Sequence, residues 1–214
     1  IMDRYDPRNR IGLLVDEWGN WHDVEPGTNP GFLYQQNTLR DAMVAAVNLD
    51  LFNKYCRRVK MANIAQTVNV LQAMILTKED EMVKTPSYYV FKMYKVHHDA
   101  TLLPSEVKTE MYSYGNESIP AVSTSASKAA DGSVHVTISN INPNEALDLT
   151  CELRGMENVS FERGEIITGD KINSYNDFGE DEEVSPKSFS NVKVSGNVLD
   201  VNLPAKSIVM LELK

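Results

Sequence analysis

The spacing of apolar residues divides the chain into two parts that differ in predicted structure. An uninterrupted apolar run at residues 11–15 predicts a strand that is buried on both faces, as in a parallel sheet. Residues 38–58 carry apolar side chains at intervals of three and four, which predicts a helix. Residues 59–70 return to strand-like character, and a second helical pattern follows at residues 85–96.

The resulting order is strand, helix, strand, helix, and the strands are apolar. This order is typical of βα repeats built on a parallel sheet. Two such units cannot close a barrel by themselves. The first part is expected to span residues 1–103, because the character of the pattern changes near Leu103 and Pro104.

Short segments that alternate apolar and polar residues fill the second part, residues 104–214. A period of two predicts strands with one face in water, and several short strands at this spacing predict an antiparallel β-sandwich. A hairpin turn is indicated at residues 129–133, Ala-Ala-Asp-Gly-Ser. The acidic run Glu180–Glu183 favours a solvated loop over a cation site. The predicted strands are residues 122–127, 133–141, 146–153, 198–203 and 207–213.

Composition narrows the classes of function. The 214 residues carry a formal net charge of -9, which argues against a nucleic-acid partner because such binding usually needs a basic face. No apolar run approaches the roughly 20 residues of a membrane span, so no membrane partner is expected. Cys56 and Cys151 lie far apart in dissimilar segments, and a disulfide between them is not expected. No Cys/His cluster indicates a metal site, and we expect no cofactor.

The first predicted strand ends in Asp-Glu-Trp at residues 16–18, and a second tryptophan, Trp21, follows. Catalytic residues of (β/α)8 barrels lie at the carboxyl ends of the strands. A carboxylate beside aromatic rings at such a place is what glycoside cleavage uses, because the carboxylate attacks the sugar and the rings pack on its C–H faces. The alternative is structural: Glu17 pairs with Arg10 or Arg40, and the tryptophans belong to the core.

Four motifs occur in order along almost the whole chain. They are the DEW-x-x-W strand end, LRDAMVAAVNLDLF at residues 39–52, VKMANIAQTVNV at residues 59–70, and an Asn-rich loop with a closing Leu-Pro-x-x-Ser strand within residues 169–214. Each motif is weak alone, but the ordered set closely resembles family 51 glycoside hydrolases, the α-L-arabinofuranosidases. The resemblance implies the last βα units of a (β/α)8 TIM barrel over residues 1–103, followed by a jelly-roll-like antiparallel β-sandwich over residues 104–214.

The resemblance also implies roles for three residues. Glu17 matches the catalytic nucleophile of a retaining mechanism, and Trp21 matches an aromatic residue that lines the sugar pocket. Gln66 matches a glutamine at the end of the last barrel strand that hydrogen-bonds arabinose, and an amide suits this role because it both donates and accepts. A strand-end residue without ligand contact is the alternative for Gln66. Trp18 is expected to pack behind the nucleophile, and residues 22–31 are expected at the rim.

A retaining mechanism needs a second carboxyl group about 5–5.5 Å from the first, as acid/base. The family carries it in an Asn-Glu pair on the fourth barrel strand, and no such strand is present here. Asn116-Glu117 follows no apolar strand and lies in a turn-rich stretch, which argues against that role. We therefore expect a C-terminal portion of a longer hydrolase that is inactive alone. Its localisation is not assigned.

The implied partners are arabinose-containing oligo- and polysaccharides, the remaining N-terminal part of the barrel, and further copies of the protein, since family members commonly form hexamers. The implied reaction releases terminal α-L-arabinofuranosyl residues from arabinan or arabinoxylan. Two alternatives stay open. One is a related retaining barrel hydrolase that acts on xylosides or glucans. The other is a non-enzymatic carbohydrate-binding or structural module, and a binding module would carry exposed aromatic residues on one sheet face.

Overall fold

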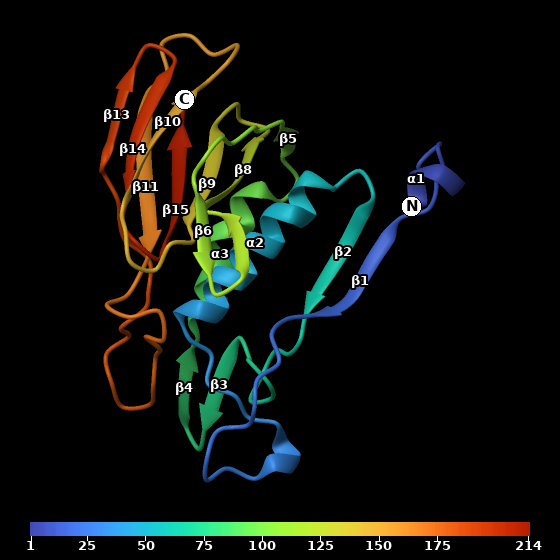
Figure 1. The fold of residues 1–214 in the computed structure, drawn as a ribbon, viewed down its shortest axis with the longest axis vertical. Helices are drawn as coiled ribbons and strands as arrows, with labels where there is room; N and C mark the ends of the chain where they lie inside the picture. Colours follow the sequence, from blue (N-terminus) through green and yellow to red (C-terminus); the bar gives the residue numbers. More distant parts are fainter.

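Residues 1–214 are described by a computed structural model, in which a β-sandwich and two helices are joined to a projecting pair of strands (Figure 1). No helix is long and apolar enough to cross a membrane. Both cysteines are free.

Helices marked η are 3-10 helices. Along the chain the elements are α1 (Met2–Tyr5), β1 (Leu13–Trp18), η1 (Pro30–Phe32), α2 (Leu39–Lys54), β2 (Val59–Ile64), β3 (Ile75–Lys78), β4 (Glu81–Lys84), α3 (Pro86–Tyr94), η2 (Lys95–His97), β5 (Thr101–Leu103), β6 (Met111–Tyr114), β7 (Glu117–Pro120), β8 (Val122–Lys128), β9 (Val134–Asn140), β10 (Leu147–Glu152), β11 (Phe161–Ile167), β12 (Lys187–Ser188), β13 (Val192–Ser195), β14 (Val198–Leu203) and β15 (Ser207–Leu213).

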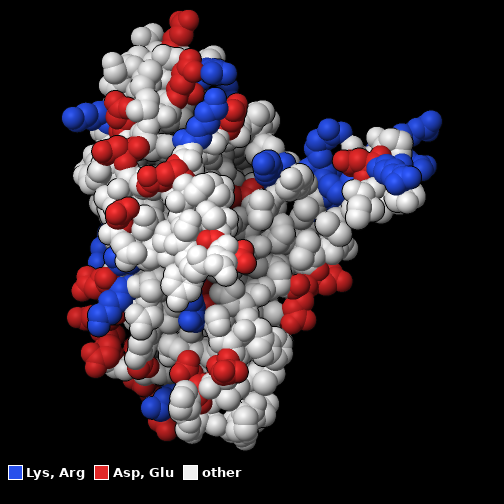
Figure 2. Space-filling view, viewed as in Figure 1, with Lys and Arg blue, Asp and Glu red and all other residues white.

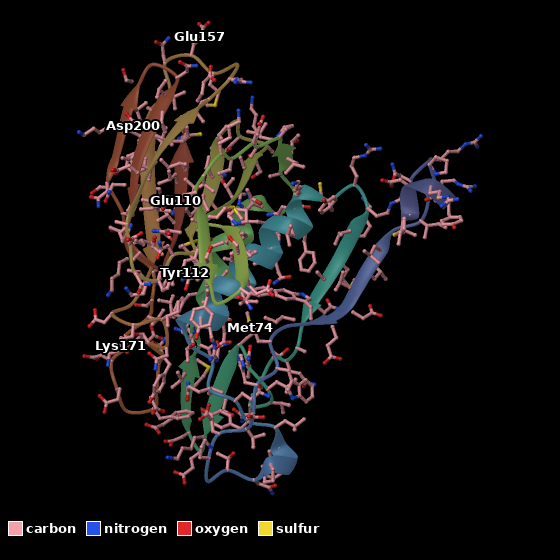
Figure 3. The ribbon with its side chains drawn as sticks, in the orientation of Figure 1. Met74, Glu110, Tyr112, Glu157, Lys171 and Asp200 are labelled. Atoms are coloured by element: carbon pink, nitrogen blue, oxygen red, sulfur yellow. The ribbon has the colours of Figure 1, made fainter.

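Strands β1 and β2 form a two-stranded parallel sheet, and α2 connects them. The predicted strand–helix–strand order is therefore confirmed. The pair projects away from the rest of the chain, and its side chains extend into open space (Figures 1 and 3). Leu14 is 53% exposed and Met61 is 50% exposed. Burial of this strand on both faces was predicted, and residues 1–214 alone do not provide it.

The helix predicted over residues 38–58 ends at Lys54. Arg58 lies beyond the helix and reaches the N-terminal segment instead, where its guanidinium pairs with Asp3 at 2.6 Å and with Asp6 at 2.7 Å. Figure 2 shows Lys and Arg side chains gathered at this far end of the strand pair. The ion pairs hold the pKa of Asp3 below its usual value, through the hydrogen bond from Arg58. The segment before β1 is thus fastened to the start of β2.

Two antiparallel sheets form the sandwich. One has the strand order β12-β11-β15-β9-β8-β5 and the other has the order β10-β14-β13. The five strands predicted in this half are confirmed as β8, β9, β10, β14 and β15, and the predicted turn joins β8 to β9. Their inward side chains form one apolar core, as the sandwich prediction requires. The fully buried members of this core include Ile138, Leu199, Leu203, Val209, Leu211 and Leu213.

Helices α2 and α3 cover the second face of the six-stranded sheet. Their apolar residues pack with Ile167, Ile208 and Met210 in a separate cluster. The expectation of one wet face is therefore wrong for the central strands: all seven residues of β9 are buried, including Thr137 and Ser139. The alternating pattern marks a polar face, but helices rather than water cover it.

A polar layer centred on Asp50 lies between these helices and the sheet. The buried Asp50 carboxylate accepts hydrogen bonds from Tyr94 at 2.9 Å and Ser123 at 2.5 Å. The His97 ring lies beside it, 2.7 Å from the Ser127 hydroxyl and 3.1 Å from that of Thr137. Burial raises the pKa of Asp50 to about 6 and lowers the pKa of His97 to about 4.

Strand β5 is hydrogen-bonded to β8 within the six-stranded sheet, so the sheet already begins at residues 101–103. The domain boundary at residues 103 and 104 stays a prediction. The acidic run Glu180–Glu183 lies in a long loop, residues 168–186, which we call the strap. Glu182 accepts a hydrogen bond from Tyr89 of α3, and Glu183 accepts one from Ser174. The strap therefore ties the sandwich to the helices, and its carboxylates act as hydrogen-bond acceptors.

Candidate active site

The carboxyl ends of β1 and β2 lie side by side. Trp18 is in register with Ile64, and the backbone N–H of Ala65 donates to the Trp18 carbonyl at 2.9 Å. Glu17 comes one residue before this contact and Gln66 one residue after it, across a cis peptide bond between residues 65 and 66. Two of the three predicted site residues therefore belong to the same edge of the parallel pair.

The Glu17 side chain is exposed and makes no hydrogen bond or ion pair with the chain. The two arginines that could have neutralised it are engaged elsewhere. Arg10 lies 3.6 Å from Asp6, and Arg40 lies 3.1 Å from Asp41. The alternative in which Glu17 pairs with one of these arginines is therefore wrong. A carboxylate without a partner at a strand end is free to meet a ligand.

The two tryptophans after Glu17 have opposite environments. Trp18 packs with the helix cluster: its ring stacks on Phe91 with centroids 6.0 Å apart and meets Phe52 edge-on at 5.3 Å. Trp21 is 66% exposed and has no aromatic partner. Trp18 therefore packs against the helices, next to Glu17 in the sequence, whereas Trp21 is largely exposed to solvent. An exposed indole can pack on the apolar face of a sugar.

Gln66 is exposed, and its side-chain amide makes no hydrogen bond with the chain. Its backbone carbonyl accepts from the N–H of Met74, in the segment that leads to β3, at 3.2 Å. Figure 3 labels Met74 just beyond the end of β2. The backbone at residue 66 is therefore held while the amide stays available, which suits a hydrogen-bonding contact to a polyol.

Several candidates from the sequence lie outside this site. Glu117 is the first residue of β7, which pairs only with β6 in a separate two-stranded sheet. Asn116-Glu117 is therefore not part of the edge that carries Glu17. No group of three or more His, Cys, Asp or Glu side chains is arranged to hold a metal ion. Asn69 has a local structural contact, because its side chain accepts from the Thr77 N–H at 2.7 Å.

The aromatic residues of the sandwich do not line one sheet face. Phe189 is buried, and Phe161 packs against the sandwich core. Tyr114 is 81% exposed on the β6–β7 hairpin, and Tyr175 is 41% exposed in the strap. Scattered rings of this kind do not build the flat aromatic platform that a carbohydrate-binding module requires.

A buried polar network behind the loop after β1 was not predicted. Gln35, Asn37 and Asp41 are each at most 3% exposed. The sequence held one signal for it: Thr38 and Asp41 have the spacing of a capping box, in which the side chain at the third helical position accepts from the N-cap backbone. That bond is present at 2.8 Å from the Thr38 N–H to Asp41.

Residues 16–207 match the family model described as the alpha-L-arabinofuranosidase C-terminal domain. An intracellular exo-alpha-L-arabinofuranosidase of Bacteroides ovatus is 54% identical over 215 residues, which cover 100% of this chain and 42% of that protein. The crystal structure of a GH51 arabinofuranosidase from Xanthomonas axonopodis pv. citri superposes with a TM-score of 0.96 at 47% identity, over 100% of this chain and 43% of that one.

A more distant structure supports the fold alone. The alpha-L-arabinofuranosidase of Thermotoga maritima, solved as an arabinose complex, has a TM-score of 0.84 at 22% identity, over 98% of this chain and 44% of that one. The chain thus spans less than half the length of these relatives. The model match and the high identity confirm the resemblance drawn from the four motifs. The chain belongs to the family of the alpha-L-arabinofuranosidase C-terminal domain.

Proposed function

We propose that this chain forms the C-terminal part of a retaining α-L-arabinofuranosidase that releases terminal α-L-arabinofuranosyl residues from arabinan- or arabinoxylan-type glycans. The observation that carries the proposal is the unpartnered Glu17 carboxylate at the carboxyl edge of a parallel strand pair. Catalytic groups of (β/α)8 barrels lie at this edge. The 54% identical relative is itself an exo-alpha-L-arabinofuranosidase.

In this proposal Glu17 attacks the anomeric carbon, and the bond to the leaving oxygen breaks as the glycosyl ester forms. A second carboxyl group protonates that oxygen and then removes a proton from the water that hydrolyses the ester. This acid/base comes from outside the 214 residues. Trp21 packs on the sugar, and the Gln66 amide binds its hydroxyl groups.

The remaining barrel strands are the proposed cover for the β1–β2 pair. Parallel strands are normally buried on both faces. The exposed apolar side chains of this pair, Leu13, Leu14 and Met61, are 40%, 53% and 50% exposed. Strand β10 is likewise an open edge of its sheet, beside a groove lined by residues 108–110 and 145–149. We propose that an extended segment from the N-terminal part completes this sheet. A homo-oligomer is proposed on the family resemblance only.

The decisive experiment replaces Glu17 in the complete hydrolase. Glu17→Ala is expected to lower kcat on an aryl α-L-arabinofuranoside by roughly 10³–10⁶-fold, because the covalent intermediate cannot form. Added azide should restore turnover and give the arabinosyl azide with inverted configuration, which identifies the missing group as the nucleophile.

Glu157→Gln is the matched control, because it neutralises an exposed carboxylate in a distant sandwich loop (Figure 3). Its kcat should stay unchanged. If Glu17→Ala keeps full turnover, the proposal is wrong and a structural module becomes the better explanation. Faster cleavage of aryl xylosides or glucosides by the unaltered enzyme would favour the related hydrolase instead. The 214-residue chain alone should show no measurable rate.

A further inference from the structure

Helix α2 carries a buried carboxylate in its first turn that the proposed mechanism does not use. Asp41 is 3% exposed, and it contacts the loop that follows β1. Its Oδ1 accepts a hydrogen bond from Asn20 Nδ2 at 2.8 Å and lies 3.3 Å from His22 Nε2. Asn20 and His22 flank Trp21 directly in the sequence. One carboxylate therefore holds the residues on both sides of the exposed indole.

Asp41 is itself firmly placed. Its Oδ2 accepts from the backbone N–H of Thr38 at 2.8 Å, so the carboxylate is part of the helix cap. The first amides of α2 are bound to the strap: Leu39 N–H donates to the Ser174 carbonyl at 2.8 Å, and Arg40 N–H to the Ile172 carbonyl at 2.7 Å. The helix end that carries Asp41 is thus fixed from the sandwich side.

A second buried side chain holds the same loop from the opposite direction. Gln35 is 1% exposed, and its Oε1 accepts from the His22 backbone N–H at 2.7 Å. Gln72, in the loop after β2, donates to the same oxygen at 3.4 Å. The loops that follow β1 and β2 are therefore joined by one buried network, which ends at the residues around Trp21.

Trp21 cannot be held by its own packing. The residue is 66% exposed, and its ring stacks on no other aromatic ring. The position of such a side chain is set by the backbone on either side of it. Two buried side chains hold the residues on either side: Asp41 contacts the side chains of Asn20 and His22. Gln35 accepts from the His22 backbone N–H.

We infer that Asp41 is a positioning residue for Trp21, acting through Asn20 and His22, and that it keeps the indole at the edge beside Glu17. The part that concerns turnover rests on the proposed function; the part that concerns Trp21 rests on the contacts alone. Asp41 is not a catalytic residue, because its side chain is 1% exposed and its oxygens are occupied. A misplaced sugar-binding ring would lower the rate although no reacting group had changed.

The test is a double-mutant cycle in the complete hydrolase. Asp41→Asn is expected to lower kcat/KM by about 100-fold, the size of effect that a displacement of about 1 Å produces at an active site. In a Trp21→Ala background the same substitution should cost less than about threefold, because the ring through which Asp41 acts is gone. Two fully additive effects would overturn the inference.

Asp50→Asn is the matched control. It makes the same chemical change at a second buried carboxylate of the same helix, 4% exposed and in contact with the sandwich. It should alter the unfolding temperature but leave kcat/KM within about twofold of the unaltered enzyme in both backgrounds. An Asp50→Asn variant as slow as Asp41→Asn would show that the loss comes from general destabilisation, and would overturn the inference.

A second readout does not depend on activity. The protein is labelled with 5-fluorotryptophan, and the ¹⁹F resonance of Trp21 is identified by its loss in Trp21→Phe. Asp41→Asn should shift or broaden this resonance, whereas Asp50→Asn should leave it in place. If Asp41→Asn does not fold, Asn20→Ala and His22→Ala remove the two donors at partly exposed positions and should move the same line. An unmoved Trp21 line in all folded variants contradicts the inference. An enzyme that is inactive on arabinofuranosides but whose line moves contradicts only the proposed function.

Discussion

The central sandwich strands and the β1–β2 pair are built from similarly apolar sequences, yet their burial is opposite. In β15, Leu211 is fully buried between the sandwich core and its neighbours, and six of the seven residues of the strand are buried. In β1, Leu14 is 53% exposed, and no residue of the strand is buried. The difference lies in the surroundings: the sandwich strands have a sheet or helices on each face, and the pair meets the helices mainly through Trp18 at its carboxyl end. An apolar run therefore predicts that a strand is stable when both faces are buried, but only the structure shows whether neighbouring elements bury it.

Helix α2 belongs to both regions. Its first turn holds the loop after β1 through Asp41, and its later part holds the sandwich through Asp50 and the cluster with Ile208. The candidate site thus lies on a strand pair that makes few buried contacts, and helix α2 connects this pair to the buried core of the sandwich region. A site on such a support is placed by a few hydrogen bonds rather than by a large apolar contact area.

Hydrogen exchange should reveal the largest difference between the two regions. In the 214-residue chain, amides of β9 and β15 are expected to exchange more than about 10³-fold more slowly than those of β1 and β2, because few buried contacts oppose opening of the pair. In the longer enzyme proposed above, the β1 and β2 amides should approach the protection of the sandwich. Equal protection in the 214-residue chain would show that the pair is stable without a cover.

Two leucine-to-alanine substitutions compare the contributions of the two regions to the free energy of unfolding. Leu211→Ala should lower the free energy of unfolding by about 2–5 kcal/mol in the 214-residue chain, because it leaves a cavity in the core. Leu14→Ala in the same chain should cost less than about 0.5 kcal/mol, since the side chain is already half in water. Urea unfolding measures both. In the longer enzyme proposed above, the cost of Leu14→Ala should rise toward that of Leu211→Ala, and a cost that stayed small would argue against a buried β1.

Local patterns were enough to predict the elements in which apolar and polar residues recur at a regular spacing. The period of α2 and the alternation in β8, β9, β14 and β15 placed these elements within a few residues. Strand β11 was missed because Arg163 and Glu165 interrupt its apolar pattern. Both point outward on the sheet, where Arg163 pairs with Glu165 at 2.8 Å and with Glu212 of β15 at 2.7 Å. Only the neighbouring strand explains those charges.

The residues of the candidate site also fall into those that the sequence could predict and those that it could not. Glu17 and Trp21 could be selected from a short motif, because a carboxylate and an aromatic ring at a strand end have few structural uses. Asp41 could not be given its role, because its contacts with Asn20 and His22 join residues about twenty positions apart. The polar face of β9 was assigned to water for the same reason: the helices that cover it are distant in sequence.

The polar layer under α2 gives the smallest expected effect on the unaltered chain, because two opposite contributions to the pH dependence of its stability largely cancel. In the folded chain burial raises the pKa of Asp50 from 3.8 to about 6, so the stability gained from its neutral form is complete below pH 3.8 and is lost as the pH rises to about 6. Burial lowers the pKa of His97 from 6.5 to about 4, so stability is lost as the pH falls from 6.5 to 4. The two effects have opposite signs over nearly the same range, and in the unaltered chain they largely cancel.

Replacing one of the two groups should therefore reveal the pH dependence of stability that the other one causes. In Asp50→Asn the free energy of unfolding should fall between pH 7 and pH 4, and its difference from the unaltered chain should change by up to about 3 kcal/mol over this range. In His97→Gln the slope should reverse, with stability rising toward pH 4. The other groups that act on this layer are Tyr94, whose pKa burial raises well above its ordinary value, and His135 and His98, whose proximity lowers the pKa of His97 further. Urea unfolding at several pH values measures both slopes. Parallel profiles for the two variants would mean that Asp50 and His97 do not titrate as separate groups in the layer that joins α2 to the sandwich.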